Sequence, residues 1–299
     1  MSAQPVGTLA PDSRAWRAKA SASKVAVMLG ISPFDSPFSL WHRMNGNVPW
    51  EADNDTMRRG HYLEPAMRQW WRDQHPHLIV ERTGTWIHEE RDWQIATPDG
   101  LILDRDTREP VGILECKTSL NDSEWGDAGT DDIPEYYRVQ ALWTLDVLGL
   151  PVAEFSVLTS YFGFVSYTVP YDAERVAAIR EQVRAFMDSL ASGTPPDIDS
   201  HDQTYHAVKA LHPDIEDEHV DVPASIALPY VDALHGLEVA TAQRALATNR
   251  LALAIGNAKA GVYDGVTLAT RQSRKGGAPY LVAGRNLSTR IDTRQKDAS

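Results

Sequence analysis

A change of hydrophobic period between residues 78 and 119 constrains the fold of this chain more than any other feature. The stretches LIVERT, TWIHEE, WQIATPDGLIL and VGILECKTS are predicted to be successive strands, separated by turn sequences such as DRDTREP. A helical pattern precedes them, in which Leu63, Met67 and Trp70 recur at i, i+4 and i+7. Strands enclosed between helices in this way predict a mixed α/β domain.

The pattern after residue 119 completes this domain and then leads into a second module. Residues 134–148 are predicted to be helical, PVAEFSVLTS and FGFVSYTVP to be two further strands, and residues 172–191 to be helical again. We therefore expect a disordered lead-in over residues 1–20, an α/β domain over residues 21–195, a linker over residues 196–224, and a helix with a β-hairpin over residues 225–299.

Composition excludes several classes of protein. Cys116 is the single cysteine, so an internal disulfide and a four-cysteine iron–sulfur cluster cannot form. The sequence has no GxxxxGK[ST] loop, so we expect no use of ATP. It also lacks a signal-peptide pattern at its start and any run of about 18 apolar residues. These observations predict a cytoplasmic protein without a membrane span.

The charge is unevenly distributed along the chain. The formal net charge of −12 argues, taken alone, against a nucleic-acid partner. Residues 225–299, however, carry 10 Lys and Arg against 5 Asp and Glu, a net charge of +5. This balance suggests that the C-terminal extension contacts DNA or a partner protein.

Two short motifs in the strand region carry the strongest chemical signal. Pro98-Asp99-Gly100 is followed by Glu115-Cys116-Lys117, so that the two carboxylates lie 16 residues apart. Because side chains alternate along a strand, Glu115 and Lys117 share one face, and a neighbouring strand end can place Asp99 beside them. Converging carboxylates favour magnesium or manganese over zinc. With a lysine acting on water or on a phosphate, the set suits metal-assisted phosphodiester hydrolysis.

The same motifs also have a purely structural explanation. Asp99 can sit in a turn, and Glu115 and Lys117 can form a surface cross-strand pair. The preceding VGIL, however, is apolar enough for a buried strand, where a carboxylate and an ammonium are costly unless they are paired or bound to a metal.

Two helices add polar candidates to this set. Glu64 lies on the helix upstream of the strands. Gln140 lies on the helix that follows them, on an apolar stripe with Tyr136, Trp143 and Val147. An amide on an inward-facing stripe serves either the site or the core, where it would be an ordinary hydrogen-bonded side chain.

Five segments, taken in order, resemble the YqaJ-like viral recombinase family, relatives of the phage lambda exonuclease in the PD-(D/E)xK nuclease superfamily. They are ASKVAVMLGISPF at 22–34, MRRGHYLEPAM at 57–67, TPDGLI at 97–102, GILECKTS at 112–119 and YYRVQALW at 136–143. The resemblance implies a restriction-endonuclease-like core with a central mixed sheet flanked by helices.

The resemblance also implies roles for the motif residues. Asp99 and Glu115 would be metal ligands, with the backbone carbonyl of Cys116 contributing. Lys117 would act on the attacking water. The implied cofactor is Mg²⁺, for which Mn²⁺ would substitute.

Further roles carry over to residues outside the two motifs. Glu64 would bind a second metal or a metal-bound water, and Gln140 would orient Lys117 or the scissile phosphate. Ser23 and Arg17 resemble the family's pocket for a terminal 5′-phosphate. The spacing between them is one residue shorter than expected, which leaves Arg14 and Lys19 as alternatives to Arg17.

The activity implied by the resemblance is a 5′→3′ double-strand DNA exonuclease of phage-type recombination that generates 3′ single-stranded tails. Its partners would be double-stranded DNA ends and a single-strand annealing protein, its assembly a homo-oligomeric ring, and its location, if phage-encoded, the cytoplasm of the bacterial host. Two other functions stay open from the residues: a restriction-like or structure-specific endonuclease, and a non-catalytic DNA-binding module with the same fold.

Overall fold

The computed structural model divides the chain into two compact units, residues 1–215 (unit 1) and residues 216–299 (unit 2). The structure describes residues 3–5, 9–50, 54–285, 287 and 290–291. The elements of unit 1 are, in order, β1 (Ala3–Pro5), α1 (Arg14–Arg17), β2 (Ala20–Ser21), α2 (Ala22–Met28), α3 (Pro37–Met44), α4 (Asp55–Gln74), β3 (Leu78–Glu81), β4 (Trp86–His88), β5 (Gln94–Ala96), β6 (Gly100–Asp104), β7 (Pro110–Thr118), η1 (Asp122–Glu124), α5 (Glu135–Leu148), β8 (Val152–Leu158), β9 (Phe164–Pro170), α6 (Ala173–Ser192) and α7 (Asp202–Leu211). Those of unit 2 are α8 (Ala224–Ile255), β10 (Ala260–Tyr263), β11 (Val266–Gln272) and β12 (Tyr280–Ala283).

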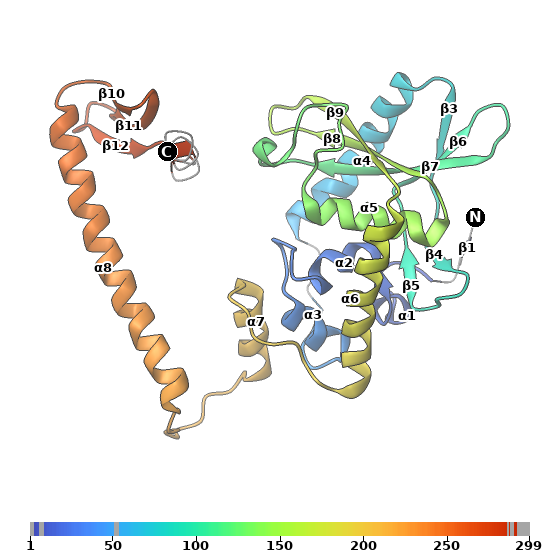
Figure 1. The fold of residues 1–299 in the computed structure, drawn as a ribbon, viewed down its shortest axis with the longest axis horizontal. Helices are drawn as coiled ribbons and strands as arrows, with labels where there is room; N and C mark the ends of the chain where they lie inside the picture. Colours follow the sequence, from blue (N-terminus) through green and yellow to red (C-terminus); the bar gives the residue numbers. More distant parts are fainter. Residues whose placement is uncertain (1–2, 6–8, 51–53, 286, 288–289, 292–299) are drawn as a thin grey trace. The chain divides into compact units, whose positions relative to one another are not determined.

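Unit 1 is built on a mixed sheet of five strands in the order β3-β6-β7-β8-β9 (Figure 1). Strand β7 runs antiparallel to β6 and parallel to β8, and α5 makes the crossover between these two parallel strands. A second sheet has the order β1-β4-β5-β2. The predicted fold class, a central mixed sheet flanked by helices, is confirmed.

Helices α4 and α5 cover opposite faces of the central sheet, and alternation along β7 divides its side chains between them. Leu114 and Cys116 pack with Met67 and Trp71 of α4. Ile113 belongs instead to the larger core that contains α5. Glu115 and Lys117 alternate with Leu114 and Cys116, so they point toward α5.

The expected disordered lead-in is ordered over its second half. The side chain of Ser13 accepts a hydrogen bond from the backbone N–H of Trp16 and so caps α1. The buried ammonium of Lys24 donates to the backbone carbonyls of Trp16, Arg17 and Lys19. Residues 9–20 are therefore held to α2, because a buried ammonium needs such acceptors. Residues 1–2 and 6–8 lie outside the described residues.

The segment expected to be a linker, residues 196–224, is also partly ordered. It contains α7, which contacts α3. The buried hydroxyl of Thr204 on α7 donates a 2.7 Å hydrogen bond to the hydroxyl of Ser36, the N-cap of α3. Helix α7 is therefore part of unit 1, and the division between the units falls after Ile215.

As far as residue 285, unit 2 contains one long helix followed by a three-stranded antiparallel sheet in the order β10-β11-β12. The predicted hairpin corresponds to β11 and β12, and β10 adds a third strand to it. In the parts of the chain that the structure describes, no helix combines the length and apolar character that crossing a bilayer requires.

Candidate active site

The turn before β6 and the second half of β7 bring the two sequence motifs together. Strand β6 starts at Gly100, directly after Asp99, and pairs with β7 so that Gly100 lies opposite Leu114. Asp99 consequently lies beside the residues that follow Leu114. Its Oδ2 accepts a 2.7 Å hydrogen bond from the backbone N–H of Cys116.

A close approach of β3 explains the glycine of the first motif. A Cβ atom at Gly100 would lie only 2.5 Å from Cγ1 of Val80. A larger residue would push the start of β6, and Asp99 with it, away from β7.

One oxygen of Glu115 collects two donors from different elements. Its Oε2 accepts from Nζ of Lys117 at 2.8 Å and from Nε2 of Gln140 at 3.0 Å. Glu115 is 2% exposed, so the carboxylate depends on these partners in place of water. The amide of Gln140 is therefore hydrogen-bonded to the buried carboxylate of Glu115.

The other oxygen of Glu115 has no such partner. Among the described residues, Oε1 is buried and makes no hydrogen bond. Burial raises the pKa of Glu115 to about 7, although the neighbouring ammonium of Lys117 pulls this pKa down. The charges of Asp99 and Glu64 add to the rise. A carboxylate in this position is suited to a cation, which would satisfy Oε1 and offset the repulsion.

Lys117 is enclosed by anionic and aromatic groups. Burial acts to lower its pKa, but the charges of Glu115 and Asp99 outweigh burial and hold the pKa above its ordinary value. Its Nζ also lies 5.3 Å from the centre of the Tyr137 ring on α5. The ammonium is thus charged and held in place from both β7 and α5.

Glu64 approaches the same place from α4. It forms an ion pair with Arg68, one helical turn further along. Burial raises the pKa of Glu64, and the charge of Asp99 raises it further. Pro65, the next residue, has no N–H to donate to the carbonyl of His61, so the helix backbone is interrupted beside the carboxylate.

Two clefts open on this arrangement and share part of their lining. The first, of about 270 Å³, is lined by Glu64, Asp99, Gln140 and Ser23 together with neighbouring side chains. The second, of about 690 Å³, is lined by Arg17 and again by Ser23. Ser23 therefore lies between the carboxylates and a larger cavity, whose lining includes Arg17 and Asp12.

The two residues assigned to phosphate binding differ in how they are held. Ser23 is the second residue of α2, whose N-cap is Ser21, and the two hydroxyls lie 3.1 Å apart. The guanidinium of Arg17 lies 5.0 Å from the ring centre of Trp50, and its Nε lies 3.9 Å from Oδ1 of Asp12. Of the alternatives, Lys19 donates to the carbonyl of Asp92, and neither Lys19 nor Arg14 lines the two clefts.

The three carboxylates share one neighbourhood, but each is engaged by its own partner. Asp99 accepts from the Cys116 N–H, Glu115 from Lys117 and Gln140, and Glu64 from Arg68. In this arrangement the described part of the chain contains no group of three His, Cys, Asp or Glu side chains gathered closely enough to hold a metal ion. A cation bound by Oε1 of Glu115 would leave its Lys117 and Gln140 contacts in place, whereas one bound by Glu64 would compete with Arg68.

Several residues of the clefts carry no sequence signal that identifies them beforehand. His61 and Arg82 line the smaller cleft, and Lys24, Arg43 and Trp50 line the larger one. His61 falls within the segment MRRGHYLEPAM and Lys24 within ASKVAVMLGISPF, both of which resemble the family, but Arg82, Arg43 and Trp50 lie outside the five segments.

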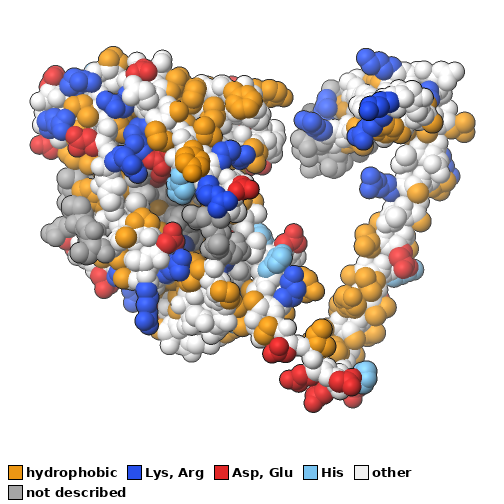
Figure 2. All heavy atoms as spheres, turned by 180° about the vertical axis from the view of Figure 1, so that it is seen from behind, with side chains coloured by type: hydrophobic (Ala, Val, Ile, Leu, Met, Phe, Trp, Pro, Cys, Tyr) orange, Lys and Arg blue, Asp and Glu red, His pale blue; other side chains and the backbone are white. Residues whose placement is uncertain are grey.

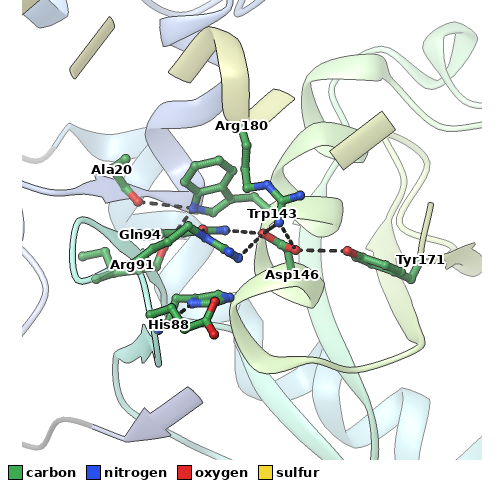
Figure 3. Close-up of polar contacts among 10 residues, drawn as sticks. Ala20, His88, Arg91, Gln94, Trp143, Asp146, Tyr171 and Arg180 are labelled. Atoms are coloured by element: carbon green, nitrogen blue, oxygen red, sulfur yellow. Dashed lines mark hydrogen bonds and ion pairs between the residues drawn. The ribbon is translucent and has the colours of Figure 1, made fainter. Parts of the chain in front are cut away.

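A buried ion network fixes α5 near its C-terminal end (Figure 3). Asp146 on α5 accepts hydrogen bonds from Nε2 of Gln94 at 2.7 Å, Nη2 of Arg91 at 3.0 Å and the hydroxyl of Tyr171 at 3.0 Å. Arg180 on α6 adds a further ion pair at 3.1 Å. The carboxylate therefore ties α5 to β5, to α6 and to the segment after β9.

Trp143, one turn before Asp146, fastens the same helix to the second sheet. Its indole N–H lies 3.2 Å from the carbonyls of both Ala20 and Ile95 (Figure 3). Because α5 is held on this side, Gln140 is presented to Glu115 at a set position along the helix.

Comparison with known proteins shows which family these residues are similar to. Residues 13–151 match the model of the YqaJ-like viral recombinase domain. The chain is 27% identical over 200 residues to the uncharacterized protein YqaJ of Bacillus subtilis (strain 168); the match covers 65% of this chain and about 60% of the length of that relative.

Two solved structures are similar in outline. An alkaline exonuclease (LHK-Exo) from Laribacter hongkongensis is 20% identical, with a TM-score of 0.47 over 66% of this chain and 95% of the other. A phage-related exonuclease from Haemophilus somnus 129PT is 13% identical, with a TM-score of 0.42 over 58% and 96% of the two chains. The likeness to the family depends on the sequence match alone: residues 13–151, which contain every candidate site residue named above, match the YqaJ-like viral recombinase domain.

Proposed function

We propose that this protein is a metal-dependent exonuclease that degrades double-stranded DNA from 5′ ends and leaves 3′ single-stranded tails. One observation carries the proposal. Glu64, Asp99 and Gln140 line one cleft, and the amide of Gln140 donates to the Glu115 carboxylate that also pairs with Lys117. The buried Oε1 of Glu115 lacks a partner among the described residues. The match to the YqaJ-like domain family supports the proposal.

The donor set fits a hard divalent cation. Asp99 and Glu115 would hold it with the carbonyl of Cys116, and Glu64 would hold a second ion or a bound water. Carboxylate and carbonyl oxygens select Mg²⁺ or Mn²⁺, and the single thiol is buried with a raised pKa that disfavours its thiolate. When bound, such an ion supplies a water of lowered pKa and offsets charge that develops on the phosphate.

The protein's own side chains supply orientation and charge. Lys117 and Gln140 converge on the same oxygen of Glu115, so their N–H groups are positioned to orient a water or a phosphate oxygen at the cleft. The pair is held from both sides, because Lys117 belongs to β7 and Gln140 to the braced helix α5. This preorganisation is the main contribution of the fold to hydrolysis.

Recognition of a DNA end is assigned to the larger cleft. Ser23 lines both clefts, and Arg17 lines the larger one. A terminal 5′-phosphate carries more negative charge than an internal diester, so a hydroxyl and a guanidinium favour it. An end bound there would place the adjoining diester near the carboxylates, which accounts for degradation from the 5′ end.

Digestion of labelled DNA tests this function. A linear duplex carries its label at the 5′ end of one strand or, in a parallel reaction, at the 3′ end, and closed circular DNA serves as the control. The proposal predicts early release of the 5′ label as mononucleotide, late release of the 3′ label, and intact circles. Cleaved circles would identify an endonuclease, and DNA binding without hydrolysis would identify a non-catalytic module.

The product suggests the partner. A 3′ single-stranded tail is the substrate of a single-strand annealing protein, and we propose such a protein as the partner in recombination. A ring of several copies around the DNA would keep the enzyme on its substrate. The net charge of +5 over residues 225–299 makes the C-terminal extension a candidate for contact with DNA or with the partner.

A further inference from the structure

A buried lysine connects the two residues assigned to phosphate binding. Lys24 follows Ser23 on α2 and is 5% exposed. Its Nζ donates to the backbone carbonyls of Arg17 and Lys19 at 2.9 Å and of Trp16 at 3.3 Å. These carbonyls belong to the end of α1 and the residues just after it. The position of Arg17 relative to Ser23 therefore depends on Lys24.

The number of donors on Lys24 matches the number of acceptors only while the side chain is charged. An ammonium has three N–H groups, one for each carbonyl, whereas a neutral amine has two and turns a lone pair toward the third carbonyl. Two aromatic rings favour the charge as well. Nζ lies 4.3 Å from the centre of the Trp16 ring and 5.4 Å from that of Trp50.

Trp50 brings two further cations to the larger cleft. Cζ of Arg17 lies 5.0 Å, and Cζ of Arg43 lies 5.9 Å, from the centre of its ring. Lys24 and both arginines line this cleft together with Ser23. Nε of Arg17 is buried and makes no hydrogen bond to any described residue. The cleft thus offers a phosphate several positive charges and a guanidinium N–H that can still donate.

The surface of unit 1 carries both signs of charge. On the face that Figure 2 shows, Lys and Arg side chains are interspersed with Asp and Glu. Attraction of DNA to a mixed surface of this kind does not distinguish a terminal phosphate from an internal one. Discrimination between them needs a local pocket whose donors are held at fixed positions.

We propose that Lys24 is a positioning residue for end recognition, whose ammonium holds Arg17 and Ser23 together as one pocket for a terminal 5′-phosphate. The inference rests on the proposed function, because it adds a residue to the pocket assigned there. Lys24 acts through its neighbours, since its three N–H groups already have acceptors. Loss of its charge should therefore change the discrimination between DNA ends.

Binding of short duplexes in chelator tests this role without hydrolysis. The full chain is titrated with a fluorescent duplex that carries 5′-phosphates or 5′-hydroxyls, and the ratio of the two dissociation constants is measured. Lys24→Met should reduce the ratio about tenfold, which corresponds to one charge-assisted hydrogen bond. Lys24→Arg keeps the charge and should retain most of the ratio. Lys209→Met is the matched control: it removes an exposed lysine of α7 that lines neither cleft, so the ratio should stay at the wild-type value.

The pH profile of the same ratio gives a second readout, which needs no variant. Burial lowers the pKa of Lys24 to about 7, although the charge of Asp12 raises it. A terminal phosphate completes its second ionisation near about pH 6, so the wild-type ratio should narrow between about pH 7 and about pH 9, as Lys24 loses its proton. Lys24→Arg should give a flat profile, because a guanidinium keeps its charge. The cleft also contains other charged or titratable groups, namely Arg17, Arg43, Asp12, Asp35 and His61.

Each adverse result identifies what has failed. A folded Lys24→Met variant that keeps the wild-type ratio overturns the role of Lys24 and leaves the nuclease unaffected. If this variant does not fold, a wild-type ratio that is constant across the pH range overturns the role. A profile that persists in Lys24→Arg assigns the titration to another group, such as His61, and overturns it too. Equal binding of the two ends by wild type removes the pocket itself, and digestion of linear duplex by the same preparation then shows whether the nuclease function stands.

Discussion

The amide of Gln140 donates to the same carboxylate oxygen of Glu115 that accepts from the Lys117 ammonium, at a distance of 3.0 Å. A residue on the crossover helix thereby positions a residue on the catalytic strand. Gln140→Met keeps the side-chain volume and removes the donor. We predict a fall in the hydrolysis rate of about 10²-fold with little change in melting temperature. Steady-state rates beside thermal unfolding check this, and an unchanged rate would make Gln140 a core amide only.

Lys117→Ala tests the group that acts on water or on developing charge. We predict a loss of roughly 10²–10³ or more in rate, since a positioned cation at the reacting centre is removed. DNA binding measured in chelator should largely survive. A variant with normal circular dichroism that still hydrolyses DNA near the wild-type rate would show that the role given to Lys117 is wrong.

The phosphate pocket is tested by a ratio of rates. Wild type should degrade 5′-phosphorylated duplex faster than 5′-hydroxyl duplex, and the double variant Ser23→Ala, Arg17→Ala should narrow this ratio, because a hydroxyl and a guanidinium are lost. A general loss of folded enzyme lowers both rates by the same factor, so it does not change their ratio. Equal wild-type rates on the two ends would show that the enzyme has no pocket for a terminal 5′-phosphate, but would not bear on the proposed metal site.

Loss of the Asp146 carboxylate should lower the stability of the protein, although Asp146 lies outside the candidate active site. Asp146→Ala leaves Arg91 and Arg180, which are 24% and 30% exposed, without their buried carboxylate. We predict a loss of about 2–4 kcal/mol in the free energy of unfolding. Asp188→Ala removes an exposed ion pair with Arg184 and should cost less than about 0.5 kcal/mol. Equal unfolding midpoints for the two variants in urea would refute this ranking.

The parts of the site that rest on local regularity could be predicted from the sequence. Alternation along one strand puts Glu115 and Lys117 on one face, and a strand starting at Gly100 carries Asp99 to its neighbour. A strong helical period placed Glu64 on the upstream helix. These predictions depend on residues close together in the chain, where periodicity is informative.

The parts that depend on distant partners could not be predicted. Residues 9–20 are ordered because the Lys24 ammonium donates hydrogen bonds to three of their backbone carbonyls. The local sequence does not predict those contacts. Helix α7 lies in a polar stretch that does not predict a helix. The hydrogen bond that attaches it to α3 joins Thr204 to Ser36, 168 positions away in the chain, so the local sequence does not indicate it.

The central claim is that the cleft lined by Glu64, Asp99 and Gln140 hydrolyses DNA with the help of a divalent cation. Release of 5′-labelled mononucleotide from linear duplex DNA, with Mg²⁺ or Mn²⁺ and with chelator, tests it most directly. The account predicts release by wild type only when the metal is present, and loss of release in Asp99→Asn and Glu115→Gln, which keep the shape of the side chains but weaken ion binding. Undiminished release in chelator, or by either variant, would contradict it.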